Sequence, residues 1–136
     1  MAARRVSYVD IKAPNRAGQA AAVLKAVADA GISLQAFTGF PDGAGRSQLD
    51  LVTDELAKLR KLAKAQGWKL SPVKRGFLIR GRDRVGAVQR QLAKLAKRGV
   101  NVTAIDAVTA GRGRFGMILW VKPRDTAKAA RALGAR

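Results

Sequence analysis

The chain has 136 residues, 48% of them apolar, and a net charge of +18 from 27 Lys and Arg against 9 Asp and Glu. Because it contains no Cys and no His, it excludes disulfides, thiolate metal sites and nucleophiles that depend on a histidine base. The carboxylates form no tight cluster apart from Asp54-Glu55, which is typical of a helix start. We therefore expect no enzyme activity, no metal and no other cofactor.

The positive charge is spread unevenly along the chain. Residues 1–68 carry a net charge of +4, whereas residues 69–136 carry +14. A half this basic attracts polyanions through phosphate contacts, although the same charge is also typical of a solvated surface in an arginine-rich proteome. No apolar run reaches the length of a signal-peptide core or a membrane span, so we expect a cytoplasmic protein with no membrane partner.

The sequence contains an internal repeat with an offset of 68 residues. When positions 11–53 are set against 79–121, eleven pairs are identical, compared with about four expected by chance for a composition rich in Ala, Gly and Arg. We place the two units at residues 1–73 and 74–136. Units of this size rarely bury enough surface to be stable alone, so we expect the halves to share an interface and to associate with a partner chain.

Repeat one predicts six elements, in the order strand, helix, strand, strand, helix, strand. Its first helix has an apolar stripe of Ala20, Leu24 and Val27 at helical spacing, and Gly31 lies where a left-handed helix cap is favoured. The strands are expected at 6–12, at 32–36, through Leu49 and Leu51, and at 68–74, with a hairpin loop at 41–46 and a second helix at 55–65.

Repeat two follows the same pattern but stops early. Its helical stripe is Val88, Leu92 and Leu95, and a second helix fits 125–133. The chain ends where a fourth strand should begin, and an uncovered strand edge is a liability, so we expect another unit to lie against it. Ile118 and Trp120 alternate with the residues assigned to the helices. They predict an exposed apolar contact, and hence a homodimer or higher oligomer.

Each unit is therefore β-α-β-β-α-β, which is the order of the ferredoxin-like α+β fold. This fold has an antiparallel sheet with helices on one face. The second repeat lacks its last strand.

The turns and the glycines of both repeats resemble those of ACT domains, small regulatory modules that bind amino acids. Asn15-Arg16-Ala17-Gly18 and Asp83-Arg84-Val85-Gly86 are similar to the D-x-x-G loop of that family. Gly31-Ile32-Ser33-Leu34 and Gly99-Val100-Asn101-Val102 are similar to its G-I-N-I stretch. The pair occurs twice at one spacing, as two tandem copies covering nearly the whole chain. The resemblance implies a non-catalytic regulatory or sensor module whose ligand is a free amino acid and whose regulated enzyme is unknown.

The resemblance also implies where the ligand binds: between two modules, with the loop of one facing the second-strand start of its neighbour. Repeat one departs from the pattern, with Asn15 for Asp and Ser33 for Asn, so one loop is expected to bind while the other only holds the fold. The candidate ligand-binding residues are Asn15, Arg16, Ala17, Gly18, Gln19, Ser33, Leu34, Asp83, Arg84, Val85, Gly86, Ala87, Asn101 and Val102.

The chemistry of the loop agrees with ligand binding, but a simpler interpretation stays open. Gly18 and Gly86 begin helices whose first N–H groups lack internal partners and favour a carboxylate, and Asn15 or Asp83 can accept from an ammonium group. Alternatively, Asn15 and Asp83 serve only as N-terminal helix caps.

Nucleic-acid binding is the competing function. RNA-recognition motifs share the β-α-β-β-α-β order, and residues 114–120, Arg-Phe-Gly-Met-Ile-Leu-Trp, partly resemble their third-strand signature. Base stacking needs aromatic side chains on the open face of the sheet. Phe115 and Met117 are instead expected to face the helices, so we rank a nucleic-acid partner second.

Overall fold

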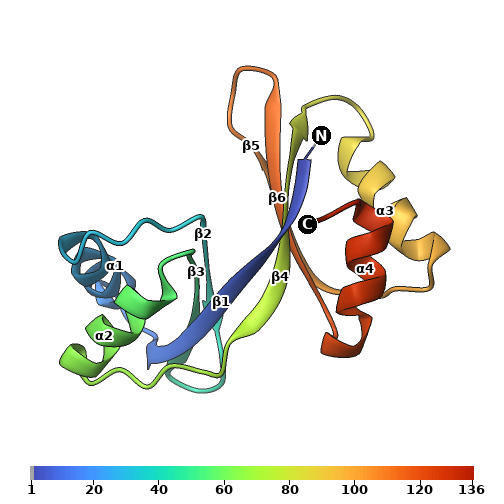
Figure 1. The fold of residues 1–136 in the computed structure, drawn as a ribbon. Helices are drawn as coiled ribbons and strands as arrows, with labels where there is room; N and C mark the ends of the chain where they lie inside the picture. The colour runs from blue at the N-terminus through green and yellow to red at the C-terminus, as the bar shows by residue number, and fades with distance from the viewer. Residues whose placement is uncertain (1) are drawn as a thin grey trace. The chain divides into compact units, whose positions relative to one another are not determined.

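The computed structural model describes residues 2–136, which divide into two compact units (Figure 1). Ser7–Lys74 form one unit, which we call the N-terminal unit. Residues 2–6 and Arg75–Arg136 form the other, the C-terminal unit. The α+β class and the ferredoxin-like arrangement are confirmed, and Figure 1 shows both helices of each unit on one side of its strands.

The N-terminal unit has the strand order β2-β3-β1. Its strands are antiparallel, and Val9 of β1 lies opposite Leu51 of β3. Both side chains join Val27, Ile32 and Leu59 in a buried core between the sheet and the helices. Its elements are β1 (Ala2–Pro14), α1 (Gln19–Asp29), β2 (Ala36–Pro41), β3 (Arg46–Val52) and α2 (Leu56–Gln66).

The C-terminal unit repeats this plan with the strand order β1-β4-β6-β5. Phe77 of β4 lies opposite Leu119 of β6, and both are completely buried. They pack with Leu95 of the first helix and Leu133 of the last. Its elements are β4 (Lys74–Arg82), α3 (Ala87–Lys97), β5 (Val102–Thr109), β6 (Arg114–Val121), a 3-10 turn (Pro123–Asp125) and α4 (Thr126–Leu133).

Strand β1 supplies residues to both units, which the sequence did not predict. It begins at Ala2, four residues earlier than expected, and lies beside β4. Ala3 packs against the core of the C-terminal unit. In the ferredoxin-like order the fourth strand lies beside the first, so the beginning of β1 occupies the place of the strand that repeat two lacks. The edge of β4 is covered by the chain itself.

The fourth strand expected at 68–74 is wrong for residues 68–73, which are neither helix nor strand. Trp68 and Leu70 pack against the core of the N-terminal unit. The N–H of Ser71 donates to the carbonyl oxygen of Asp10 at 2.9 Å, and the Asp10 N–H donates to Ser71 Oγ at 2.9 Å. This exchange with a side chain replaces the regular backbone ladder, and strand geometry begins only at Lys74.

The second strands also begin later than expected, because Ile32 packs as part of the loop that follows α1. Its N–H donates to the carbonyl oxygen of Val27 at 3.1 Å, closing the end of that helix. The side chain is 6% exposed and lies in the core. Strand pairing in this hairpin therefore starts at Ala36.

The expected exposure of Ile118 and Trp120 is wrong, since they are 5% and 6% exposed. The indole of Trp120 lies over Gly76 of β4, where a Cβ atom would approach Trp120 Cδ1 and Nε1 to 3.3 Å. The absence of a side chain at Gly76 therefore makes room for the indole. These two residues no longer provide an argument for an oligomer contact.

Within residues 2–136, none of the helices is both long enough and apolar enough to span a membrane.

Candidate functional site

The loops that join the first strand to the first helix have the same backbone structure in both repeats. Gly18 and Gly86 have φ angles of 88° and 80°, the left-handed region that favours glycine. The N–H of Asn15 donates to the carbonyl oxygen of Gly45 at 2.9 Å, and the N–H of Asp83 donates to that of Gly113 at 2.7 Å. Each loop is therefore attached to the hairpin turn of its own repeat.

The helix-cap interpretation of Asn15 and Asp83 is not supported. Gly18 and Gly86 are the N-cap residues, and neither helix start has a side-chain cap. Asp83 lies three residues before its N-cap, so its carboxylate is placed in the loop.

The backbone N–H groups at the start of α3 that could donate to a ligand differ slightly from those expected. The N–H of Ala87 donates to the carbonyl oxygen of Arg84 at 3.0 Å, so it is already used inside the turn. The N–H of Arg90 is the first to bond back into the helix, to Gly86 at 3.0 Å. The intervening N–H groups of Val88 and Gln89 belong to the first turn, whose donors have no acceptor within the helix.

A cavity of about 240 Å³ lies beside this loop in the C-terminal unit, and we call it the loop cavity. One side is the loop with the first turn of α3, and the other is the end of β5. It brings a carboxylate, Asp83, and a guanidinium, Arg84, together with the α3 donors. The lining residues are Asp83, Arg84, Gly86, Ala87, Val88, Gln89, Ala107, Val108, Thr109 and Phe115.

Two exposed valines lie at or near the loop cavity. Val108 of β5 is 68% exposed and lines the cavity, while Val85, between the lining residues Arg84 and Gly86, is 98% exposed. Exposed valines flanking a charged cleft are available to contact the apolar part of a ligand or a second protein surface.

The backbone groups just before the second strand are hydrogen-bonded differently in the two repeats. In repeat one, the Ser33 N–H donates to Glu55 Oε2 at 2.9 Å, and Thr53 Oγ1 donates to the Ser33 carbonyl at 2.8 Å. The bond from Ser33 and the ammonium group of Lys58 hold the pKa of Glu55 below its usual value. Both backbone groups of Ser33 are therefore occupied.

At the equivalent Asn101 of repeat two, the positions of Thr53 and Glu55 are taken by Val121 and Pro123. Neither side chain can form such bonds. Asn101 is exposed and precedes β5, and Val102 begins that strand. Both lie at the opposite end of β5 from the loop cavity, which contains Ala107–Thr109 at the other end. Their approach to the loop of a neighbouring module stays a prediction.

Sequence reasoning missed the β5 side of the loop cavity, because the family pattern gave no role to the end of the second strand. A signal was present in the repeat itself. Gly45 and Gly113 are one of the identical pairs, and these glycines accept the loop N–H bonds. Their identity indicated that the loop touches its own hairpin.

The arrangement required for RNA stacking is not found in repeat two. Phe115 and Met117 are 6% and 1% exposed and belong to the core beneath the helices, as expected. Trp120 is also buried. These three side chains are therefore withdrawn from solvent, and the nucleic-acid alternative gains no support from them.

Comparison with known proteins identifies solved structures that share this fold. No protein-family model and no curated protein sequence matches the chain. A protein of Bacteroides thetaiotaomicron is similar in structure, with a TM-score of 0.81 at 19% identity, covering 97% of this chain and 88% of that one. The ligand-free regulatory subunit of aspartate kinase from Thermus thermophilus has a TM-score of 0.62 at 19% identity, covering 96% and 91%.

A complete enzyme also matches this chain in structure, over part of the enzyme's length. Clostridium acetobutylicum aspartate kinase, an allosteric enzyme, has a TM-score of 0.60 at 15% identity and covers 97% of this chain but only 32% of its own. At these identities the likeness establishes a shared ACT-like fold.

Proposed function

We propose that the chain is a non-catalytic regulatory module that binds a free amino acid in the loop cavity of the C-terminal unit. The observation that carries this proposal is the pairing of opposite charges around one small cavity. Asp83 would accept from the α-ammonium group of the ligand. The N–H groups of Val88 and Gln89, with the Arg84 guanidinium, would donate to its carboxylate.

The size of the cavity and the difference between the repeats support this choice. About 240 Å³ is below the range of roughly 300–1,000 Å³ found for drug-sized ligands, which suits a molecule as small as an amino acid. Repeat one has Asn15 in place of Asp83, and the backbone groups of Ser33 are occupied. We therefore assign binding to repeat two and a structural role to the loop of repeat one.

The regulatory mechanism follows from linkage. A ligand that binds one arrangement of modules better than another shifts their equilibrium by no more than its difference in affinity. We propose that a second copy of the chain supplies a neighbouring module beside the exposed Val85 and Val108, giving a homodimer whose assembly responds to the ligand. The regulated enzyme would recognise that assembly.

The function is tested by screening the free α-amino acids for an increase in melting temperature, since a ligand that prefers the folded state must stabilise it. At least one should raise it, and the matching amine without its carboxylate should not. Sedimentation with and without that amino acid would then test the link to assembly. If none of the amino acids changes the melting temperature at millimolar concentration, the chain is not an amino-acid sensor.

A further inference from the structure

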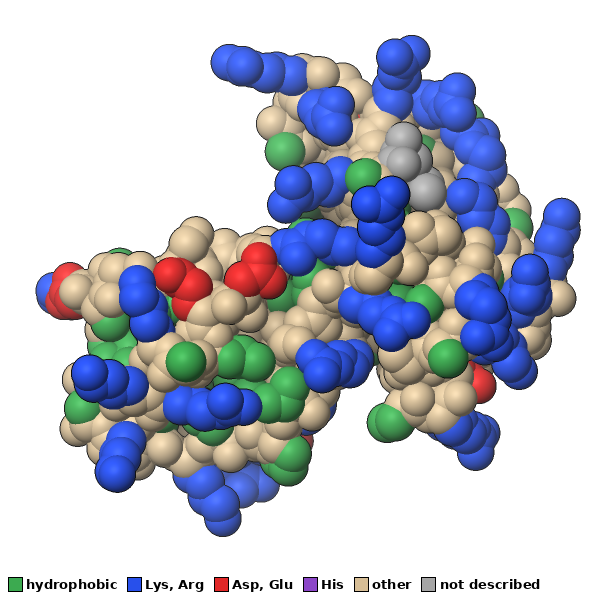
Figure 2. All heavy atoms as spheres, in the orientation of Figure 1, with side chains coloured by type: hydrophobic (Ala, Val, Ile, Leu, Met, Phe, Trp, Pro, Cys, Tyr) green, Lys and Arg blue, Asp and Glu red, His purple; other side chains and the backbone are tan. Residues whose placement is uncertain are grey.

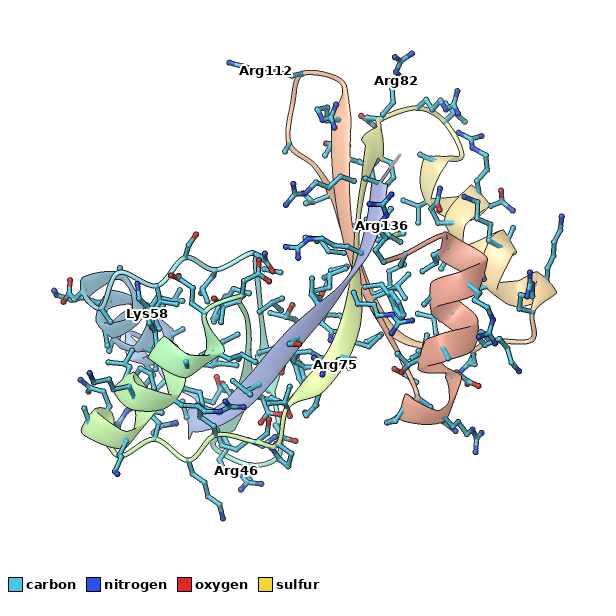
Figure 3. The ribbon with its side chains drawn as sticks, viewed as in Figure 1. Arg46, Lys58, Arg75, Arg82, Arg112 and Arg136 are labelled. Atoms are coloured by element: carbon cyan, nitrogen blue, oxygen red, sulfur yellow. The ribbon has the colours of Figure 1, made fainter. Side chains whose placement is uncertain are left out.

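A second cavity, of about 320 Å³, lies on the other side of the same loop, and we call it the arginine cavity. Three arginines line it: Arg84 in the loop and Arg90 in α3, with Arg82 at the end of β4, whose side chain lies on the other face of the sheet from Gly81 and Phe115. The remaining lining residues are Gly81, Ala87, Gln91 and Phe115, so none of the described residues that line it is acidic. Figure 3 shows Arg82 where β4 runs into the loop that leads to α3.

No carboxylate lines the arginine cavity to balance these arginines. Arg82 lies directly opposite Arg114 in the β4–β6 pairing, and like charges in that relation are destabilising. Arg90 Nη2 donates to the carbonyl oxygen of Val85 at 3.3 Å, which folds its side chain back over the loop. In residues 2–136, no ion pair joins Arg82, Arg84 or Arg90 to a carboxylate. Figure 2 shows Lys and Arg over much of the viewed side of the C-terminal unit.

A buried polar side chain completes the cavity. Gln91 is 6% exposed although it lies on the core side of α3. Its Oε1 accepts from Lys94 Nζ at 3.3 Å, and the Gln91 side chain makes no other hydrogen bond in the described chain. The Nε2 group is not among the fully buried side-chain atoms of the described residues that lack a partner, so it is an accessible donor at the cavity wall.

Repeat one shows that the fold does not need any of these side chains. The positions equivalent to Arg82, Arg90 and Gln91 are Pro14, Ala22 and Val23. Val23 is buried in the core of its unit, as an apolar residue on that helix face should be. Repeat two has thus replaced a proline, an alanine and a buried valine by two cations and an amide, all around one cavity.

We propose that the arginine cavity binds the phosphate group of a small free molecule. A phosphate carries up to two negative charges and offers several acceptor oxygens, which match the paired donors of guanidinium groups. The Gln91 amide supplies a neutral donor at the base. A single carboxylate would leave most of these donors and charges unmatched. This site does not rest on the amino-acid site: Arg90 and Gln91 line only the arginine cavity, Asp83 and Val108 line only the loop cavity, and Arg84 lines both.

The test measures the stabilisation of the protein by inorganic phosphate, against chloride and succinate at matched ionic strength. The variants are Arg90→Ala and Gln91→Val, which restore the residues of repeat one. Arg112→Gln is the matched control, because Arg112 lies on the β5–β6 turn and points away from the sheet in Figure 3. Phosphate should stabilise the parent and the control more than either reference anion does. Its affinity should fall at least tenfold in Arg90→Ala and Gln91→Val.

Gln91→Val is the most informative variant, because it should keep the stability of the parent without phosphate and lose the stabilisation that phosphate provides. Without phosphate it should be at least as stable as the parent, because valine is the buried residue at the equivalent position of repeat one, Val23. With phosphate it should lose the stabilisation. An equal response to phosphate in all variants would mean diffuse charge screening and would overturn the proposal. So would no response in the parent, or succinate stabilising it as well as phosphate does.

Discussion

The N–H of Arg5 donates to the carbonyl oxygen of Arg136 at 3.1 Å, joining the first strand of the chain to its last residue. Both residues belong to the C-terminal unit. Together with the packing of Ala3, this bond shows that residues 2–6 are a structural part of repeat two.

Placing a charge in this strand should therefore destabilise the C-terminal unit. Ala3→Asp would press a carboxylate against the apolar core, at a cost of about 1–3 kcal/mol in the free energy of unfolding. Ala2→Asp, one residue earlier at an exposed position, should cost little. Chemical denaturation of the two variants makes the comparison, and equal stability would mean that the strand contributes nothing to the unit.

Two glycines in neighbouring strands should respond oppositely to alanine. At Gly76 a Cβ would lie 3.2 Å from the Leu119 carbonyl oxygen and 3.3 Å from Trp120, so Gly76→Ala should destabilise by about 1–3 kcal/mol. At Gly116 a Cβ meets nothing within 4 Å. Gly116→Ala should stabilise by about 0.5–1 kcal/mol, because alanine reduces the freedom of the unfolded chain. Denaturation midpoints of both variants test this, and a loss of Trp120 burial should accompany only the first.

The buried carboxylate of Asp50 should make stability depend on pH. Asp50 lies opposite Asp10 in the β1–β3 pairing, and both are nearly inaccessible. Burial raises the pKa of Asp50, and the charge of Asp10 adds to the rise. A hydrogen bond from Gln48 and the charges of Lys74 and Lys12 oppose it.

Because the folded-state pKa of Asp50 is raised, ionisation disfavours the folded state, and stability falls as pH rises through that pKa. Asp50→Asn keeps an acceptor for Gln48 and removes the charge. It should therefore be more stable than the parent at pH 7, with the gain disappearing below the ordinary aspartate pKa of 3.8. Thermal melts at pH 3 and pH 7 measure this. If Asp50→Asn is less stable than the parent at pH 7, the ion pair between Lys74 and Asp10 offsets the cost of burying both carboxylates.

The repeat made much of the fold predictable. Helical spacing found the stripe through Val27, and the glycine-rich hairpins were placed correctly, because these signals are local and occur twice. The addition of residues 2–6 to repeat two was not predictable, since strand exchange between repeats depends on which edge is left uncovered. The face of Trp120 was assigned correctly, but its burial over Gly76 depends on a neighbouring strand that no local pattern reveals.

The candidate site was predictable in part for the same reason. The loop from Asp83 to Gly86 has a sequence signature, and it does line a cavity. The end of β5 and the arginine cavity have none, because they are formed by side chains that meet only after folding. The internal repeat carries the signal there: the buried position occupied by Val23 in repeat one is occupied by the polar Gln91 in repeat two.

The most direct test of the proposed function compares one substitution in the two equivalent loops. Asp83→Ala and Asn15→Ala remove side chains at matching positions, and neither residue is a helix cap in the structure. The dissociation constant of the stabilising amino acid should be measured by calorimetry for the parent and both variants. Binding should be lost in Asp83→Ala, with its folding intact, and unchanged in Asn15→Ala. Unchanged affinity in Asp83→Ala, or an equal loss in both variants, would contradict an amino-acid site in the loop cavity of repeat two.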